Sequence, residues 1–245
     1  MLGRKEEMAA ALQQYVAQIK NQPEVIGILA TGSFVHGEIG PYSDVDVYVI
    51  LAEGCTYRER GNTWIDGIEI EYFQNPPAQV RAYFRQEGNR PNTAHMLAHG
   101  RLLYEVDAVV GNLITEASAL IAQPPAAWSS VQREFAKYGI DDQLKDYEDC
   151  LLAGDALSAK LIGSQIVEEA IRVFCGVHQL HLEKKKRVLA YVEKKDASFA
   201  SALRRAIRSN GTTQKDVQHL VGLTETLLGG KRDQEWIMRG PLDLG

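Results

Sequence analysis

The chain has 245 residues, of which 45% are hydrophobic and 24% are charged, a composition typical of a globular protein that folds in water. Its formal net charge of -5 argues against a protein whose affinity comes mainly from neutralising nucleic-acid phosphates, so nucleic acid is not an expected partner and small molecules are. The three cysteines lie far apart without metal-ligand spacing, the first residues lack the apolar core of a signal peptide, and no uncharged apolar run has membrane-spanning length. These features predict a cytoplasmic protein.

The first part of the chain predicts one helix followed by strands. Apolar residues at helical spacing indicate a helix over residues 4–20, which ends at Asn21-Gln22-Pro23. Short runs rich in β-branched and aromatic residues, separated by turn residues, predict three strands. The predicted strands cover residues 25–30, 45–52 and 64–73. Two short helices are expected next, over residues 78–86 and 92–99.

From about residue 107 onward, the sequence pattern is helical. Apolar stripes recur at helical spacing within 155–175 and 217–228. Strands followed by a long run of helices favour an α+β protein. We therefore predict a small mixed-sheet domain over residues 1–106 and an all-helical bundle domain over residues 107–245.

The segment TGSFVHGEIGPYSDVDVYVIL, residues 31–51, places two aspartates on the second predicted strand. Because alternate side chains of a strand share a face, Asp44 and Asp46 point to one side and the intervening valines point into the core. Two neighbouring carboxylates call for a compensating cation, and hard oxygen ligands suit Mg²⁺ together with substrate phosphates. A solvent-facing pair of aspartates at the start of a strand is the alternative interpretation.

A Gly-Ser pair precedes this strand. Gly32 allows a sharp turn and the close approach of a phosphate to main-chain N–H groups, and Ser33 offers a hydroxyl donor. The third predicted strand carries Glu69 and Glu71 on one face, where either could supply a further carboxylate. A strand that is simply half-exposed would show the same alternation. Taken together, these residues predict a site for phosphoryl chemistry.

An apolar strand, Gly-Ser, about ten residues and then Asp-Val-Asp in a second apolar strand resembles the signature of the DNA polymerase β-type nucleotidyltransferase superfamily. The motif covers roughly residues 25–73, and the order of domains resembles that of antibiotic nucleotidyltransferases such as kanamycin nucleotidyltransferase. The resemblance implies that three residues hold the nucleotide: Gly32, Ser33 and Ser43. It implies that the catalytic and metal-binding carboxylates are Asp44, Asp46 and Glu71, with Glu69 as the alternative to Glu71.

The same resemblance implies an activity. The protein would transfer a nucleoside monophosphate, AMP from ATP, to a hydroxyl of a small molecule and release pyrophosphate, using two Mg²⁺ ions. An aminoglycoside-like antibiotic is the leading acceptor, which would make the protein an antibiotic-resistance enzyme, and a homodimer is expected. The alternatives are a protein adenylyltransferase, an antitoxin-like nucleotidyltransferase, and a nucleotide-binding regulator without turnover.

Further charged residues have weaker signals. Many relatives carry an arginine after Gly-Ser where this chain has His36, so a cationic phosphate contact at that position is in doubt. His95 and His99 have the spacing of a zinc pair but lack an intervening glutamate and a third ligand. Arg90 could contact nucleotide, although a surface role is favoured. The acidic helix face between Asp142 and Asp149 could line a pocket for a polycation, but ordinary surface charge is favoured there.

Overall fold

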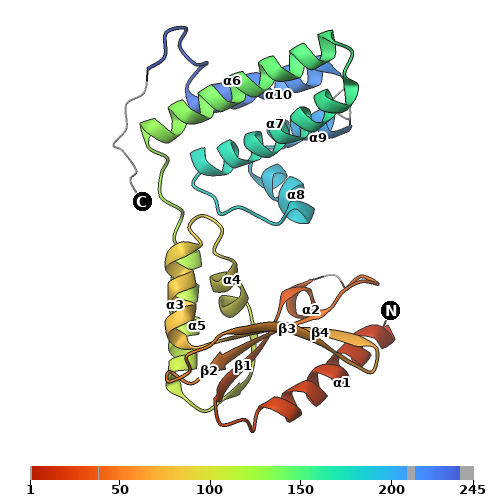
Figure 1. Ribbon diagram of the computed structural model, residues 1–245, viewed down its shortest axis with the longest axis vertical. Coiled ribbons are helices and arrows are strands. Elements are labelled where there is room, and N and C mark those ends of the chain that lie inside the picture. Colours follow the sequence, from red (N-terminus) through yellow and green to blue (C-terminus); the bar gives the residue numbers. More distant parts are fainter. Residues whose placement is uncertain (1, 38, 209–212, 238–245) are drawn as a thin grey trace. The chain divides into compact units, whose positions relative to one another are not determined.

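The computed structural model describes residues 2–37, 39–208 and 213–237. The chain forms two compact units, Met1–Pro124 and Pro125–Gly245 (Figure 1). The first unit contains a β-sheet with helices, whereas the described part of the second unit contains helices alone. The chain is therefore an α+β protein with a small mixed sheet followed by a helical region, as the sequence predicts.

The first unit is built on a five-stranded sheet with the strand order β3-β4-β2-β1-β5. The strands are β1 (Val25–Thr31), β2 (Val45–Leu51), β3 (Glu59–Ile65), β4 (Ile68–Asn75) and β5 (Arg101–Glu105). The central strands β2 and β4 are parallel, and the other neighbouring strands are antiparallel. The amino ends of β2 and β4 therefore meet at the same edge of the sheet.

Helices cover the two faces of this sheet unequally. Helix α1 (Leu2–Ile19) packs on one face (Figure 1). Leu12, Val47 and Ile70 are buried there in a common core. The opposite face is buried around Tyr48 against three helices. These helices are α3 (Pro77–Gln86), α4 (Asn92–Ala98) and α5 (Ala108–Ala122). Their core joins the carboxyl-terminal halves of β2 and β4, so the amino ends of those strands lie outside it.

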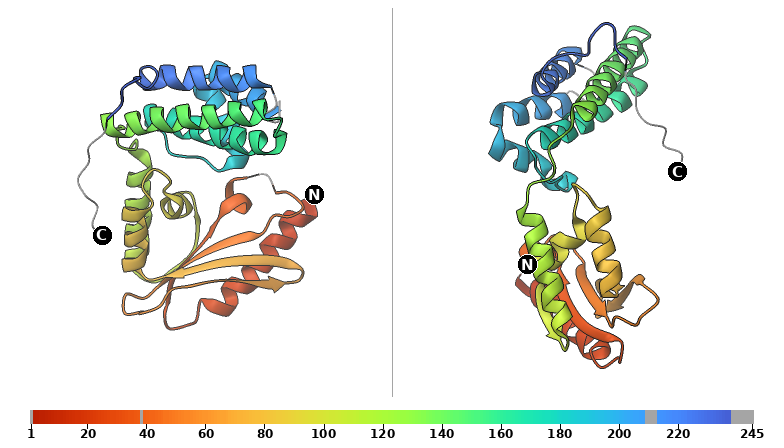
Figure 2. Two further views of the ribbon diagram at one scale, coloured as in Figure 1. Left: turned by 45° about the horizontal axis from the view of Figure 1, so that its top comes forward. Right: turned by 90° about the vertical axis from the view of Figure 1, so that its left-hand side faces the viewer.

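The second unit is a bundle of five helices in its described part. They are α6 (Ser130–Leu152), α7 (Ala156–Val177), α8 (Lys185–Lys195), α9 (Ala197–Arg208) and α10 (Gln214–Leu228). Helices α6 and α10 run side by side (Figure 2). Phe174 of α7 is fully buried with Leu203 and Leu220, and Tyr147 of α6 is fully buried with Ile166. Apolar burial of this extent is the main stabilising term of such a bundle.

Two features of the first unit differ from the sequence-based expectation. A single strand over 64–73 was wrong, because Asp66 and Gly67 adopt positive φ angles of 49° and 78° and reverse the chain into the β3–β4 hairpin. The edge strand β5 was not predicted. The two compact units divide after Pro124, and α5 buries Val110 and Leu113 against the sheet. The extent of the two functional domains stays a prediction.

Among the described residues, no helix combines the length and apolar character needed to cross a membrane.

Candidate active site

The turn after β1 brings the backbone against an aspartate of the neighbouring strand. Gly32, the first residue of the short helix α2 (Gly32–His36), has a φ of +70°. A Cβ at this position would lie 1.8 Å from Oδ2 of Asp46. Both the left-handed backbone and this close approach require glycine, so the sequence-predicted Gly32 is held directly against the predicted Asp46.

The pairing of β2 with β4 gathers three carboxylates. Asp46 lies directly opposite Glu71 in the parallel register, and Asp44 lies two residues earlier, just before β2 begins. One ligand oxygen from each of the three side chains lies within 4.8 Å of the other two. All three residues are half-buried, so their oxygens remain within reach of a ligand.

Aromatic side chains fix this register immediately below the acids. Tyr48 and Phe73 are paired on the same face, and their rings stack with centroids 6.2 Å apart. The Asn75 amide donates a hydrogen bond of 3.0 Å to the Tyr48 hydroxyl. Burial raises the pKa of Tyr48, so its hydroxyl stays neutral. Its packed ring supports the two strands that carry the acids. A shift of one residue between β2 and β4 would separate both the aromatic pair and the carboxylates.

Ser43 organises the loop that leads into β2. Its hydroxyl accepts a 2.9 Å hydrogen bond from the Gly40 N–H, and its own N–H donates to the Gly40 carbonyl at 3.1 Å. Arg4 of α1 reaches the Ser43 carbonyl oxygen, with Nη2 at 3.4 Å. This arrangement holds the start of β2 in place and brings a cation near the residue that precedes Asp44.

The two candidate glutamates of β4 have different surroundings. Glu71 joins the aspartates and also accepts hydrogen bonds from Arg60, whose Nη2 and Nε lie 2.7 and 3.2 Å from Oε1. Glu69 instead accepts a 2.6 Å hydrogen bond from the Asn62 amide. Within the described residues, Glu69 belongs to no cluster with metal-ligand spacing. The geometry therefore favours Glu71 as the third carboxylate.

Three of the histidines form an aromatic group at the end of α2, whose last residue is His36. The His36 ring meets the His99 ring edge-on at 5.8 Å, and its Nε2 contacts the His99 carbonyl oxygen. His95 stacks on His99 at 5.4 Å. The part of the chain that the structure describes contains no metal-spaced cluster that includes these rings. Arg90 is exposed in the turn before α4, where its N–H donates to the Glu87 carbonyl.

The carboxylate cluster fits a divalent cation with oxygen ligands. Hard carboxylate oxygens are the donors that Mg²⁺ prefers, and three of them converge here. The Thr31 hydroxyl lies in register with Asp46, is buried, and has no hydrogen-bond partner among the described residues. An unpaired buried hydroxyl beside an acid is unusual, since such groups are normally satisfied by protein or by a bound ligand.

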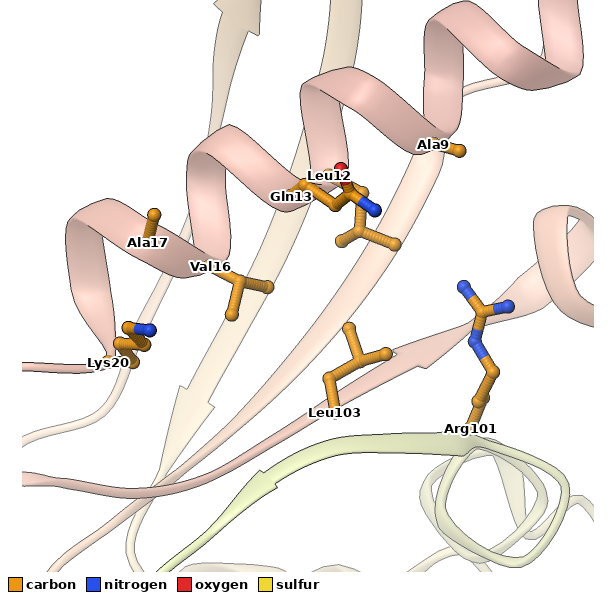
Figure 3. A pocket seen from close by; sticks show the side chains of 8 residues that line it. All are labelled: Ala9, Leu12, Gln13, Val16, Ala17, Lys20, Arg101 and Leu103. Atoms are coloured by element: carbon orange, nitrogen blue, oxygen red, sulfur yellow. The ribbon is translucent and has the colours of Figure 1, made fainter.

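The groove between α1 and β5 is a separate feature. It has a volume of about 450 Å³ and is lined by apolar residues such as Leu12 and Leu103, with Lys20 and Arg101 among its polar residues (Figure 3). None of the clustered carboxylates lines it. Leu12 and Leu103 belong to the core on the α1 face of the sheet, the face opposite to the carboxylates.

Sequence reasoning missed the basic and amide neighbours of the two glutamates. Arg60 and Asn62 lie on β3, in a part of that strand that precedes the single strand predicted over 64–73. The Asp66-Gly67 turn signal was the information that could have placed them opposite Phe73 and Glu71. Arg4 was hidden within the expected leading helix, because nothing local indicates that its side chain reaches the loop before β2.

One comparison with known proteins identifies a domain in the region that holds the carboxylates. Residues 12–94 match the family model of the nucleotidyltransferase domain, which is about a third of the chain and includes Gly32 and the three carboxylates. No curated protein matches the chain. Eleven chains of solved structures match. One is a nucleotidyltransferase-like protein from Exiguobacterium sibiricum 255-15, which is 12% identical with a TM-score of 0.49; the match covers 91% of this chain and 77% of that one. The domain match supports nucleotidyl transfer as the general class of reaction.

Proposed function

We propose that this protein is a metal-dependent nucleotidyltransferase that moves a nucleoside monophosphate, AMP from ATP, onto a hydroxyl of a small molecule and releases pyrophosphate. One observation carries the proposal. Asp46 and Glu71 lie opposite each other on parallel strands with Asp44 beside them, inside a region that matches a nucleotidyltransferase domain. Oxygen ligands at this spacing suit Mg²⁺, and the reaction uses a magnesium-bound triphosphate as donor.

In this proposal, each residue of the site has its own role. Asp44, Asp46 and Glu71 hold the divalent ions. Gly32 has no side chain, so the backbone of the turn after β1 can approach the triphosphate, and Ser33 offers its hydroxyl to a phosphate oxygen. Ser43 acts through the loop, since its hydroxyl secures the backbone that leads into Asp44.

Bound Mg²⁺ would offset the charge that develops on the phosphate oxygens while the bond to pyrophosphate breaks. The acceptor hydroxyl must lose its proton as it attacks the α-phosphorus. A carboxylate of the cluster within hydrogen-bond reach of that hydroxyl would act as general base, which is typically worth about 10² to 10⁴ in rate. The half-buried position of the cluster keeps its oxygens accessible while the stacked aromatic pair holds the strands beneath them rigid.

The choice of acceptor rests on the resemblance to antibiotic nucleotidyltransferases. An aminoglycoside-like compound carries several hydroxyls and positive charges, which suits a site rich in carboxylates.

Incubation with ATP, Mg²⁺ and a panel of aminoglycosides, lincosamides and lysate metabolites tests the proposal. We expect an acceptor whose mass increases by one AMP and an equal amount of pyrophosphate. Asp46→Asn should abolish both products, whereas Asp142→Asn, which changes an exposed aspartate of α6 outside the carboxylate cluster, should leave both unchanged. Nucleotide binding without pyrophosphate release for any acceptor would favour the regulator, and labelling confined to lysate proteins would favour protein adenylylation.

A further inference from the structure

Arg60 is placed against the carboxylate cluster in a specific way. Two of its nitrogens lie within hydrogen-bond distance of one oxygen, Oε1 of Glu71. Its guanidinium also lies over the Phe73 ring, 4.8 Å from the centroid. Arg60 pairs with Phe73 across the β3–β4 hairpin, so the side chain reaches Glu71 diagonally along the same face of the sheet. The Phe73 ring and the Glu71 carboxylate therefore both hold the Arg60 side chain in place.

We propose that Arg60 is a positioning residue that competes with the metal ions: it holds Glu71 toward the aspartates in the nucleotide-free protein and lowers the affinity of the cluster for divalent cations until the nucleotide binds. This inference rests on the proposed function, because it takes the carboxylates as metal ligands. It concerns the residue that balances their charge, which the resemblance did not identify.

The charges of the site lead to this competition. Three ionised carboxylates within 4.8 Å repel one another, and Arg60 offsets one of the three negative charges. Arg4 is a second cation near this edge of the sheet, and its Nη2 lies 3.4 Å from the carbonyl oxygen of Ser43. A divalent ion at Glu71 would share a single carboxylate with Arg60, so the two cations repel each other at short range. A bound triphosphate adds negative charge at the site, which offsets the repulsion between Arg60 and the metal ion.

Arg60 has two opposing effects on metal affinity. Holding Glu71 in place favours metal binding, but side-chain exposures of 69% for Arg60 and 27% for Glu71 mean that solvent screens this ion pair. An exposed pair of this kind changes an equilibrium by about fivefold at most. Repulsion between a guanidinium and a divalent ion on the same carboxylate is larger, because one charge is doubled and the separation is only a few ångströms. Loss of Arg60 should therefore increase metal affinity.

Titration of the full chain with Mn²⁺, followed by the electron paramagnetic resonance signal of free Mn²⁺, tests this inference without relying on turnover. The variants are Arg60→Gln and Arg60→Lys. Arg58→Gln is the matched control, because Arg58 precedes the same strand but contacts the Tyr83 hydroxyl and ring instead of a carboxylate. Thermal unfolding of each variant checks that it folds.

In the absence of nucleotide, Arg60→Gln should bind Mn²⁺ about three- to tenfold more tightly than the parent protein, with a smaller difference at 0.5 M than at 0.05 M salt. Arg60→Lys, which keeps the positive charge that repels the metal ion, and Arg58→Gln should stay within about twofold of the parent. A non-hydrolysable ATP analogue should reduce the gain. A purely structural role for Arg60 would not produce a gain in affinity.

Unchanged or weaker Mn²⁺ binding by Arg60→Gln would overturn the competition, provided that the parent protein binds the ion. A gain that is equally large with the ATP analogue would overturn its link to the nucleotide. If the parent protein itself binds no Mn²⁺, with or without the analogue, the carboxylates are not a metal site and the proposed function fails as well. The parent titration therefore separates failure of this inference from failure of the function on which it rests.

Discussion

Asp46 and Glu71 face each other across β2 and β4, the parallel pair of strands in an otherwise antiparallel sheet. An antiparallel pairing would place the amino end of one strand beside the carboxyl end of the other. The parallel register instead brings the beginnings of both strands together, outside the core formed by α3, α4 and α5. Two acids can therefore approach each other at the edge of a buried sheet while their oxygens stay accessible.

The two glutamates of β4 offer a comparison within one strand. Glu71→Gln should lower nucleotidyl transfer at least 100-fold, because it removes a carboxylate from the cluster that we propose to hold the metal ions. Glu69→Gln, on the same face but bonded to Asn62, should stay within about threefold of the parent rate. Initial rates of pyrophosphate release at saturating ATP and Mg²⁺ measure both.

The reverse ranking would assign the third carboxylate to Glu69 and contradict the site as we propose it. Both variants should unfold at nearly the parent temperature. The Arg60–Glu71 pair is exposed, and pairs of this kind contribute less than about 1 kcal/mol to stability.

Gly32 should be intolerant of any side chain. Gly32→Ala adds a Cβ at the position of the Asp46 carboxylate and keeps a left-handed backbone, which costs about 1–2 kcal/mol for a residue other than glycine. We expect loss of magnesium-nucleotide binding by at least tenfold together with reduced stability. Isothermal titration with a non-hydrolysable ATP analogue measures the binding.

Gly67→Ala is the control for backbone strain. Gly67 also has a positive φ, 78°, but a Cβ there meets no atom within 4 Å. This variant should lose a similar amount of stability and keep nucleotide binding. Equal loss of binding in both variants would show that strain, and not the approach to Asp46, explains the effect of Gly32→Ala.

Part of this site could be predicted from the sequence, because its signals are local. Alternation along the strand predicts that Asp44 and Asp46 share a face, and Gly-Ser after an apolar strand predicts a tight turn. The third carboxylate could not be identified in this way, because Glu69 and Glu71 share one face of the strand and periodicity does not distinguish them. The register of β4 against β2 distinguishes them, and register depends on packing such as the Tyr48–Phe73 stack.

The fold shows the same division between local and non-local information. Helical periodicity within 155–175 predicted α7, but it did not predict which residues of the apolar stripe are buried. Leu157 and Leu161 are 81% and 65% exposed, whereas Phe174 of the same helix is fully buried. Strand β5 has five residues without clear alternation, so its pairing with β1 is a tertiary effect.

Glu225 should make the stability of the helical unit depend on pH. Burial raises the pKa of this carboxyl, and the Lys231 ammonium group, 3.8 Å away, offsets burial only in part. The folded state therefore binds the proton more tightly than the unfolded state does. The resulting contribution to stability is present below the unfolded pKa of about 4.5 and is lost as pH rises through the higher folded value.

Glu225→Gln removes this penalty, so the variant should unfold at a higher temperature than the parent at pH 7 and at nearly the same temperature at pH 4. Glu193 provides the opposite case, because its hydrogen bonds with Arg204 lower its pKa. Glu193→Gln should slightly lower stability at pH 7, with the difference disappearing in acid. Circular dichroism melts at pH 4 and pH 7 measure these effects. A Glu225→Gln variant that is less stable than the parent at pH 7 would refute the account.

Three helical glycines of the second unit should respond to alanine in opposite directions. In α7, a Cβ on Gly176 would lie 2.0 Å from Cε2 of Trp128, whose ring also carries the Arg172 guanidinium at 4.6 Å. Displacing the half-buried Trp128 ring should cost about 1–3 kcal/mol, typical of overpacking. In α6 and α10, a Cβ on Gly139 or Gly222 would meet no atom within 4 Å. Alanine there should stabilise by about 0.5–1 kcal/mol, because it restricts the unfolded chain and favours the helix. Urea unfolding monitored by tryptophan fluorescence measures all three variants, and a Gly176→Ala protein as stable as the parent would contradict the packing of Trp128 against α7.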